Sequence, residues 1–277
     1  MPEFPTSISN INKRLQTLGA FDADRKARII ANIIAAQMLP DSALRGGTSL
    51  KIKFGDSSTR ASSDLDVALA GDREIFIDQY KENLASGWNG FSGVLTPSKK
   101  KSKPKGVPQN YITETWNLKL SFRGGEWLKQ EIDLAHDEIG DTSEAVYEAS
   151  SEIWNWFEVC GLPQPAPIRV IKAEHQIAQK LHALVEDSVE RIHDLVDLQV
   201  ILKNQQIDYQ LAGSICKQLF RSRKSTTWPP LLAVPVSVEP NYDSYEADTE
   251  IGVGLSEAVD WCNKLITELN VRSNSAH

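Results

Sequence analysis

Gly46-Gly47-Thr48-Ser49-Leu50 and, shortly downstream, Asp64-Leu65-Asp66 are the two segments that decide how the rest of the sequence is interpreted. Because Gly46 and Gly47 have no side chains, backbone N–H groups there can approach a phosphate closely. Thr48 and Ser49 add hydroxyl groups, and a helix that began here would present a positive N-terminus to an anion. The spacing fits neither the P-loop nor the dinucleotide-binding fingerprint. Taken alone, the glycine pair favours a simple turn into a helix or strand.

The carboxylates of the second segment stand at strand positions. The run from Leu65 to Leu69 is short, apolar and β-branched at Val67, which predicts a strand. Asp64 and Asp66 are two residues apart and therefore share one face of it. Asp133 lies in a separate predicted strand that could pair beside the first.

Three converging carboxylates repel one another, so such clusters usually persist around a cation. Oxygen ligands alone favour Mg²⁺ or Mn²⁺. The alternatives are a solvated Asp-x-Asp pair near a turn, and a capping or turn role for Asp133.

The surrounding pattern predicts a small mixed sheet followed by a mainly helical half. Apolar periodicity, alternation and the turn residues Arg123-Gly124-Gly125 predict helices at 22–38 and 73–86 and strands at 65–69, 111–122 and 127–135. Downstream, the pattern predicts helices at 173–187, 190–203 and 255–270, with a loop at 225–253. We therefore expect an α+β fold with domains at 1–140 and 141–277.

Composition restricts the class of protein. The chain has 277 residues, near-average apolar and charged content and a net charge of −7. Its three cysteines form no C-x-x-C pair, which argues against a zinc or redox site and favours a reducing compartment. Neither a signal peptide nor a membrane-spanning run is visible. We expect a soluble, cytoplasmic protein without a membrane partner.

One strongly basic segment stands out in this acidic chain. It contains five lysines: Lys99, Lys100, Lys101, Lys103 and Lys105. A concentrated basic loop is a natural contact for an RNA backbone. A solvated surface loop is the alternative.

The ordered set of motifs resembles the AbiEii and MenT family of nucleotidyltransferase toxins, within the DNA polymerase β-like superfamily. The family carries G-G-T-x-L and then R-x-S-x-D-L-D, which matches the glycine segment and the run from Arg60 to Asp66. Its E-x-x-x-A-x-K-L-x-A-L and R-x-R-D-L-Y-D-L helices resemble 174–184 and 191–198. His193 and Val196 stand where the family has Arg and Tyr.

The resemblance implies roles for particular residues. The metal ligands would be Asp64, Asp66 and Asp133. The catalytic set would be Asp64, Asp66, Lys180 and Asp194, and the nucleotide would contact Gly46, Gly47, Thr48, Arg60, Ser62 and Lys180. The helical domain would then complete the active site. In the MenT branch, a serine at the position of Ser62 is phosphorylated by the antitoxin kinase.

Independent of the resemblance, Lys180 shares a predicted helix face with Ile177 and Leu184, where an unpaired charge is costly. A lysine that extends its head to the edge of a core is the other interpretation. Asp194 and Asp197 are three apart and share a face of the next predicted helix, which is also compatible with a solvated surface.

The resemblance implies transfer of a nucleoside monophosphate from an NTP to an RNA acceptor, with the 3′ end of tRNA as a candidate, in a toxin–antitoxin or phage-defence system. The cofactor would be Mg²⁺ or Mn²⁺, and the partner an AbiEi-like or MenA-like antitoxin. Two other functions stay open: nucleotidyl transfer to a small molecule or a protein, and non-catalytic nucleotide or RNA binding.

Overall fold

The chain forms two compact units, one of which draws on two separate stretches of sequence. The structure, a computed structural model, describes residues 2–19, 22–99, 112–148 and 150–275. The N-terminal unit comprises Met1–Gly55 and Ser62–Val170, and the C-terminal unit comprises Asp56–Ala61 and Ile171–His277. The sequence placed the boundary at residue 141, whereas the structure keeps 141–170 with the first unit, because β7 in that stretch pairs with β1.

The N-terminal unit contains a mixed sheet. Among the described residues, seven strands form one sheet in the order β3-β4-β5-β2-β1-β7-β6. The strands are β1 (Ser42–Arg45), β2 (Leu65–Leu69), β3 (Phe91–Pro97), β4 (Glu114–Phe122), β5 (Gly125–His136), β6 (Val146–Glu148) and β7 (Ile168–Val170). β2 runs parallel to β5 and β1 runs parallel to β7, while the other pairs are antiparallel. With the helices, this sheet confirms the α+β class.

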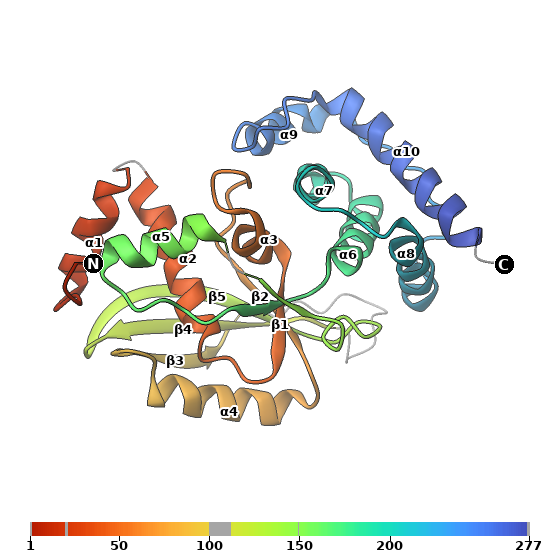
Figure 1. Cartoon of the computed structure of the whole chain (residues 1–277). Helices are drawn as coiled ribbons and strands as arrows, with labels where there is room; N and C mark the ends of the chain where they lie inside the picture. The colour runs from red at the N-terminus through yellow and green to blue at the C-terminus, as the bar shows by residue number, and fades with distance from the viewer. Residues whose placement is uncertain (1, 20–21, 100–111, 149, 276–277) are drawn as a thin grey trace. The chain divides into compact units, whose positions relative to one another are not determined.

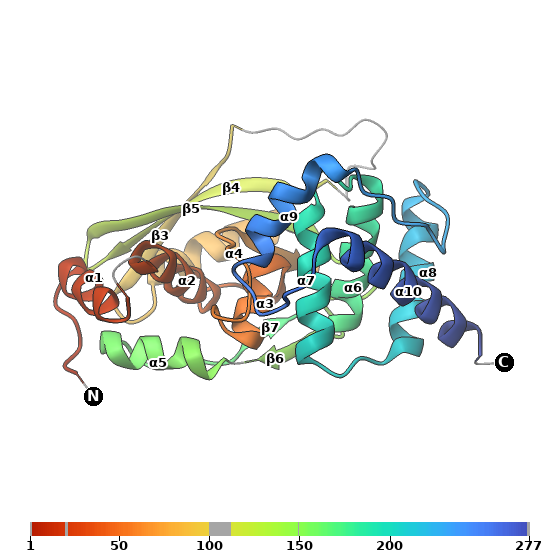
Figure 2. The same ribbon diagram turned by 90° about the horizontal axis from the view of Figure 1, so that it is seen from above.

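Helices cover one face of this sheet. They are α1 (Ile8–Thr17), α2 (Ala23–Ala36), α3 (Gly46–Phe54), α4 (Arg73–Ser86) and α5 (Ser151–Cys160). In Figure 1, α2 crosses in front of the strands and α4 runs along the β3 edge, and Figure 2 shows α1, α2 and α4 on the same side of β4 and β5. Leu65 and Val67 of β2, Ile132 of β5 and Ile33 of α2 are fully buried in the resulting core.

Local sequence explains the elements that were predicted best. The Asp72 side chain accepts hydrogen bonds from the backbone N–H groups of Glu74 and Ile75, which caps α4, and Gly87 ends it at φ 78°. Between β4 and β5, Arg123 and Gly124 have φ values of 49° and 81°. Two consecutive residues with positive φ form the tight turn that suits a two-residue hairpin.

The C-terminal unit is helical. Its helices are α6 (Ala173–Glu186), α7 (Ile192–Asn204), α8 (Tyr209–Arg223), η3 (Val236–Val238), α9 (Glu239–Glu246) and α10 (Leu255–Asn274). α6 packs against α7 and α8, and α10 packs against α8. At Gly213 a Cβ would come within 2.2 Å of the Leu269 backbone oxygen, so the missing side chain lets α8 and α10 approach closely. The predicted loop at 225–253 was wrong in part, because it contains η3 and α9.

Candidate active site

Two of the three predicted carboxylates are paired on neighbouring strands. Asp66 in β2 is the direct parallel partner of Asp133 in β5. Paired residues on neighbouring strands point to the same face. Asp64 immediately precedes β2. Asp64 is exposed, and the other two are half-buried. The expected pairing of the two strands is therefore confirmed.

Hydrogen bonds hold the Asp133 side chain and the backbone of Asp64. The Thr115 hydroxyl donates to Asp133 Oδ1 at 2.7 Å. The Thr48 hydroxyl donates to the backbone oxygen of Asp64 at 2.7 Å, while Asn32 Nδ2 donates to Thr48 Oγ1 at 3.2 Å. Because Thr48 uses its hydroxyl proton inside the protein, it braces the segment before β2.

Gly46 sets how closely α3 approaches the carboxylates. β1 ends at Arg45, and α3 begins at Gly46 with a φ of 66°. A Cβ at Gly46 would lie 2.0 Å from Asp66 Oδ2. Only glycine fits this position, where both the backbone conformation and the space exclude a side chain. The first turn of α3 contains no acidic residue, and the Arg45 side chain does not cap it.

The donor set matches a hard divalent cation in its chemistry. Asp64, Asp66 and Asp133 offer only oxygen atoms, and adjacent strands lie about 4.8 Å apart, so the paired carboxylates can share an ion. In the described part of the chain, no group of three or more His, Cys, Asp or Glu side chains is already arranged as metal ligands. By donor type alone the three carboxylates match Mg²⁺, and the strand register places two of them, Asp66 and Asp133, side by side.

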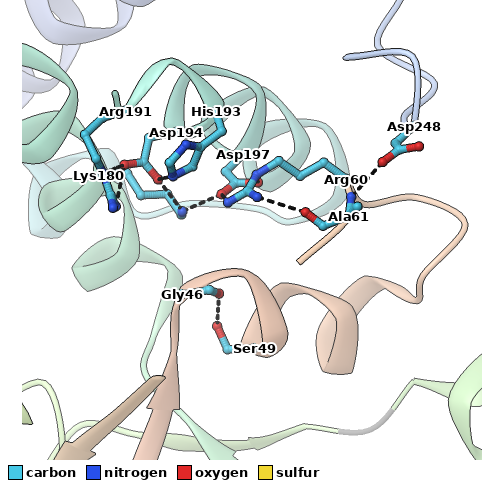
Figure 3. Close-up of polar contacts among 10 residues, drawn as sticks. All are labelled: Gly46, Ser49, Arg60, Ala61, Lys180, Arg191, His193, Asp194, Asp197 and Asp248. Carbon is cyan, nitrogen blue, oxygen red and sulfur yellow. Dashed lines mark hydrogen bonds and ion pairs between the residues drawn. The ribbon is translucent and has the colours of Figure 1, made fainter. Parts of the chain in front are cut away.

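A second cluster is a buried ion network in the C-terminal unit (Figure 3). Lys180 Nζ on α6 donates to Asp194 Oδ1 at 2.8 Å and to Asp197 Oδ2 at 2.6 Å on α7. Arg60 holds Asp197 with two hydrogen bonds of 2.9 Å, from Nε to Oδ1 and from Nη2 to Oδ2. Arg191 donates from Nε to Asp194 Oδ2 at 2.8 Å. Three cations therefore surround two carboxylates, which leaves the cluster net positive.

Residues 56–61, which precede β2 in the sequence, belong to the C-terminal unit. One residue of α9 and one residue that follows α9 hold them there. The Arg60 guanidinium lies 5.7 Å from the centre of the Tyr245 ring. The backbone N–H of Ala61 donates to Asp248 Oδ2 at 2.7 Å. These contacts fix the direction from which Arg60 reaches Asp197, as Figure 3 shows for Arg60, Ala61 and Asp248.

Burial and the neighbouring charges shift the pKa values of Lys180 and Asp197 in opposite directions, and the combined effect of the charges is larger. Burial alone would lower the pKa of Lys180, but Asp194 and Asp197 raise it. Burial would likewise raise the pKa of Asp197, but the charges of Lys180 and Arg60 hold it well below its usual range. Lys180 and Asp197 are therefore ionised at neutral pH. Burial lowers the pKa of the neighbouring His193 to about 4, so His193 is neutral there.

The predicted site residues thus fall into two groups. The N-terminal unit contains the three carboxylates with Gly46, Gly47, Thr48 and a half-buried Ser62. The C-terminal unit contains Arg60, Lys180 and Asp194, together with Asp197. Sequence reasoning missed the role of Asp197 as the carboxylate that joins Lys180 to Arg60, although its three-residue spacing from Asp194 was visible.

Of the five lysines predicted to bind RNA, the structure describes one. Lys99 is exposed. The other four, Lys100, Lys101, Lys103 and Lys105, lie outside the described residues. Within the described residues, no helix is long and apolar enough to cross a lipid bilayer.

Comparison with solved structures identifies the class of the fold. The chain is similar to the nucleotidyltransferase toxin MenT4 of Mycobacterium tuberculosis H37Rv, with 16% identity, a TM-score of 0.56 and coverage of 97% of this chain and 99% of that one. It is also similar to a putative nucleotidyltransferase from H. pylori, with 15% identity, a TM-score of 0.49 and coverage of 91% and 96%. The fold is that of nucleotidyltransferase toxins.

The family follows from the sequence itself. The profile described as "Nucleotidyl transferase AbiEii toxin, Type IV TA system" matches residues 28–263. The chain therefore belongs to the AbiEii family of nucleotidyltransferase toxins of type IV toxin–antitoxin systems. No curated protein matches the chain.

Proposed function

We propose that this protein transfers a nucleoside monophosphate from an NTP to an RNA acceptor and releases pyrophosphate. The observation that carries the proposal is the pairing of Asp66 with Asp133 beside the first turn of α3 at Gly46. A site for a metal-bound triphosphate needs oxygen ligands and a nearby group of anion-binding N–H donors. Family membership supports the reaction type.

In this proposal, Asp64, Asp66 and Asp133 would hold Mg²⁺ or Mn²⁺. A bound divalent cation supplies charge neutralisation for the triphosphate and the departing pyrophosphate. The backbone N–H groups of Gly46 and Gly47 would hold phosphate oxygens. Thr48 keeps the segment before β2 in place through its bond to Asp64.

The buried network would supply fixed positive charge. Lys180 and Arg60 are both held by Asp197, and Asp194 holds Lys180 from the other side. We assign the two aspartates as positioning residues, because each engages a cation and neither is exposed. Loss of Asp194 or Lys180 would therefore abolish transfer even where the carboxylates of the sheet are intact.

The RNA acceptor is supported by the basic segment from Lys99 to Lys105. This segment joins β3 to β4, and Thr115 near the start of β4 bonds to Asp133. Five lysines in an acidic chain would attract an RNA backbone. The 3′ end of tRNA is the acceptor we would test first.

The direct test is label transfer. Purified protein is incubated with tRNA, Mg²⁺ and each α-labelled NTP in turn, and RNA is separated on a denaturing gel. We expect label on RNA with the wild type and none with Asp66→Asn. If intact protein labels no RNA with any of the four nucleotides, the proposal fails.

A small-molecule acceptor is the second candidate, and a cavity favours it. A cavity of about 480 Å³ is lined by Asp64 and by Asn117, Lys119 and Lys129 of the neighbouring strands. Its volume suits a drug-sized ligand. Replacing the five lysines of 99–105 by alanine would abolish transfer to RNA and spare transfer to a small molecule, so this variant separates the two candidates.

An antitoxin is the expected partner of a toxin of this family. We propose that it acts at Ser62, which lies between Arg60 and the carboxylates in sequence. A phosphate on Ser62 would add negative charge next to Asp64 and oppose nucleotide binding. Mass spectrometry after co-expression with the antitoxin tests this, and an unmodified Ser62 in inhibited protein would exclude it.

A further inference from the structure

The C-terminal unit contains a basic cavity apart from the ion network. It has a volume of about 430 Å³ and is bordered by the end of α8, the residues that follow it and α10. Its lining includes Lys217, Arg221, Lys224, Trp228 and Asn270. Among the residues that the structure describes, no acidic side chain lines it, although the chain has a net charge of −7.

The three cations form one stripe. Lys217, Arg221 and Lys224 are spaced by four and three residues, so they lie on the same face of α8 and its C-cap. At 1.5 Å per residue, the stripe is about 10 Å long. Within the described residues none of the three forms an ion pair, and Lys217 Nζ donates only to the Asn274 side-chain oxygen, at 2.6 Å.

The helix dipole of α8 explains only some of the cations in this stripe. A helix C-terminus favours cations in its last turn, which explains Arg221 and Arg223 equally. Arg223, however, is engaged with His182 at 3.1 Å and does not line the cavity. Lys217 lies before the last turn, where the dipole contributes little. The cavity thus has unpaired positive charge that the helix itself does not require.

An aromatic ring is fixed beside this charge. Trp228 is half-buried, and its Nε1 donates to Asn270 Oδ1 at 3.1 Å. Its ring meets Phe220 edge-on, with centroids 5.2 Å apart. The hydroxyl residues Thr226 and Thr227 also line the cavity. Cations along a groove with a fixed aromatic side chain are the combination that binds single nucleic-acid strands.

We propose that this cavity is an RNA-binding site, with successive phosphates on Lys217, Arg221 and Lys224 and a base against Trp228. The length of the stripe favours a chain of phosphates over a single phosphate group. The inference rests on the proposed RNA acceptor and extends it by naming a place where RNA is held outside the nucleotide site.

Binding of labelled tRNA, measured by fluorescence anisotropy without NTP or Mg²⁺ at 50 to 200 mM salt, tests the site. One variant replaces all three cations by glutamine: Lys217→Gln, Arg221→Gln and Lys224→Gln. A matched control removes three cations elsewhere in the same unit: Lys203→Gln, Lys264→Gln and Arg272→Gln.

Three lost phosphate contacts should lower the salt slope by about two to three and weaken binding roughly 100-fold at 0.1 M salt. The control should stay near the wild type. Unchanged binding in the first variant, or an equal loss in both, would overturn the proposal. Binding of anionic lipid vesicles in place of tRNA by the wild type would overturn it as well.

Trp228 provides a second test that does not depend on charge. Trp228→Leu removes the stacking surface and should weaken binding about 5- to 150-fold, whereas Trp228→Phe keeps a ring and should recover most of it. Equal affinity of the two variants would contradict a stacking role. If tRNA binds through this cavity but is never labelled, the proposed transfer fails and the site stands. If tRNA is labelled and neither cavity variant matters, the site fails alone.

Discussion

Lys180→Met probes the buried network most directly. The substitution keeps the volume and unbranched shape of the side chain but removes the positive charge shared by Asp194 and Asp197. Both carboxylates are buried, at 0% and 1% exposure. Removing one partner of a buried ion pair costs about 3 to 5 kcal/mol, because the remaining charge has lost its compensation.

The two aspartates keep other partners in Lys180→Met, so we expect a loss of unfolding free energy at the lower end of that range. Asp197 keeps both hydrogen bonds from Arg60, and Asp194 keeps those from Arg191, whose side chain is 45% exposed. We therefore expect Lys180→Met to lower the free energy of unfolding by about 3 kcal/mol at pH 7. Adding Asp194→Asn should restore part of this loss, because it removes one of the stranded charges.

Urea unfolding followed by circular dichroism measures the effect. Lys203→Met on α7 is the control, since its exposed ion pair contributes less than about 1 kcal/mol. The stability that Asp197 provides is present above its unfolded pKa, near 3.8, and is lost as pH falls below it. The deficit of Lys180→Met should thus narrow below about pH 4. A variant as stable as the wild type at pH 7 would refute the assignment of a charged, buried network.

Three further outcomes follow from other parts of the structure. Asp64→Asn and Asp66→Asn should each abolish Mg²⁺-dependent NTP binding in calorimetry. The melting temperature should stay the same or rise, because repulsion between carboxylates is relieved. Retained NTP binding in both variants would contradict a metal role. Gly46→Ala should destabilise far more than Gly124→Ala, since both have positive φ but only Gly46 faces a carboxylate at 2.0 Å; equal melting temperatures would show that the contact is relieved freely. The folded-state pKa of His193, about 4, lies below the ordinary 6.5. The stability that the neutral His193 side chain provides is therefore fully present above pH 6.5 and is lost as pH falls towards 4. The wild type should therefore lose more stability between pH 7 and 5 than His193→Gln does, and parallel pH profiles would exclude this contribution.

Sequence alone predicted the elements whose signals are local. The strand at Leu65–Leu69 and the helix at Arg73–Ser86 match the structure residue for residue, because apolar alternation and the Asp72 cap lie within the elements themselves. α9 was missed within a loop rich in proline and acidic residues. Its proline occupies the first turn, where a missing N–H costs nothing, so this composition is compatible with the start of a helix.

The short strands β6 and β7 illustrate a different limit. Each has three residues and is defined by pairing, with β7 beside β1 from much earlier in the chain. No periodicity is readable over three residues. The domain boundary expected at 141 depended on these strands, and it moved once their partners were visible.

In the candidate site, too, local sequence signals could be predicted and long-range contacts could not. Asp64, Asp66 and Asp133 could be grouped from sequence because strand spacing and one pairing suffice. The bond between Arg60 and Asp197 joins residues 137 apart, and nothing in either neighbourhood indicates the other. The direction of the Thr48 hydroxyl, towards Asp64 rather than outward, was likewise outside the reach of a motif.

The discontinuous make-up of the C-terminal unit has a consequence for synthesis on the ribosome. Arg60 is translated 137 residues before its partner Asp197. At about 5 to 20 residues per second, the interval is on the order of 10 s. During that interval the strands on either side of 56–61 are available to pair, while Arg60 itself awaits α7. The N-terminal half of the nascent chain therefore emerges with one unfinished segment, and translation of α7 is the event that allows it to be completed.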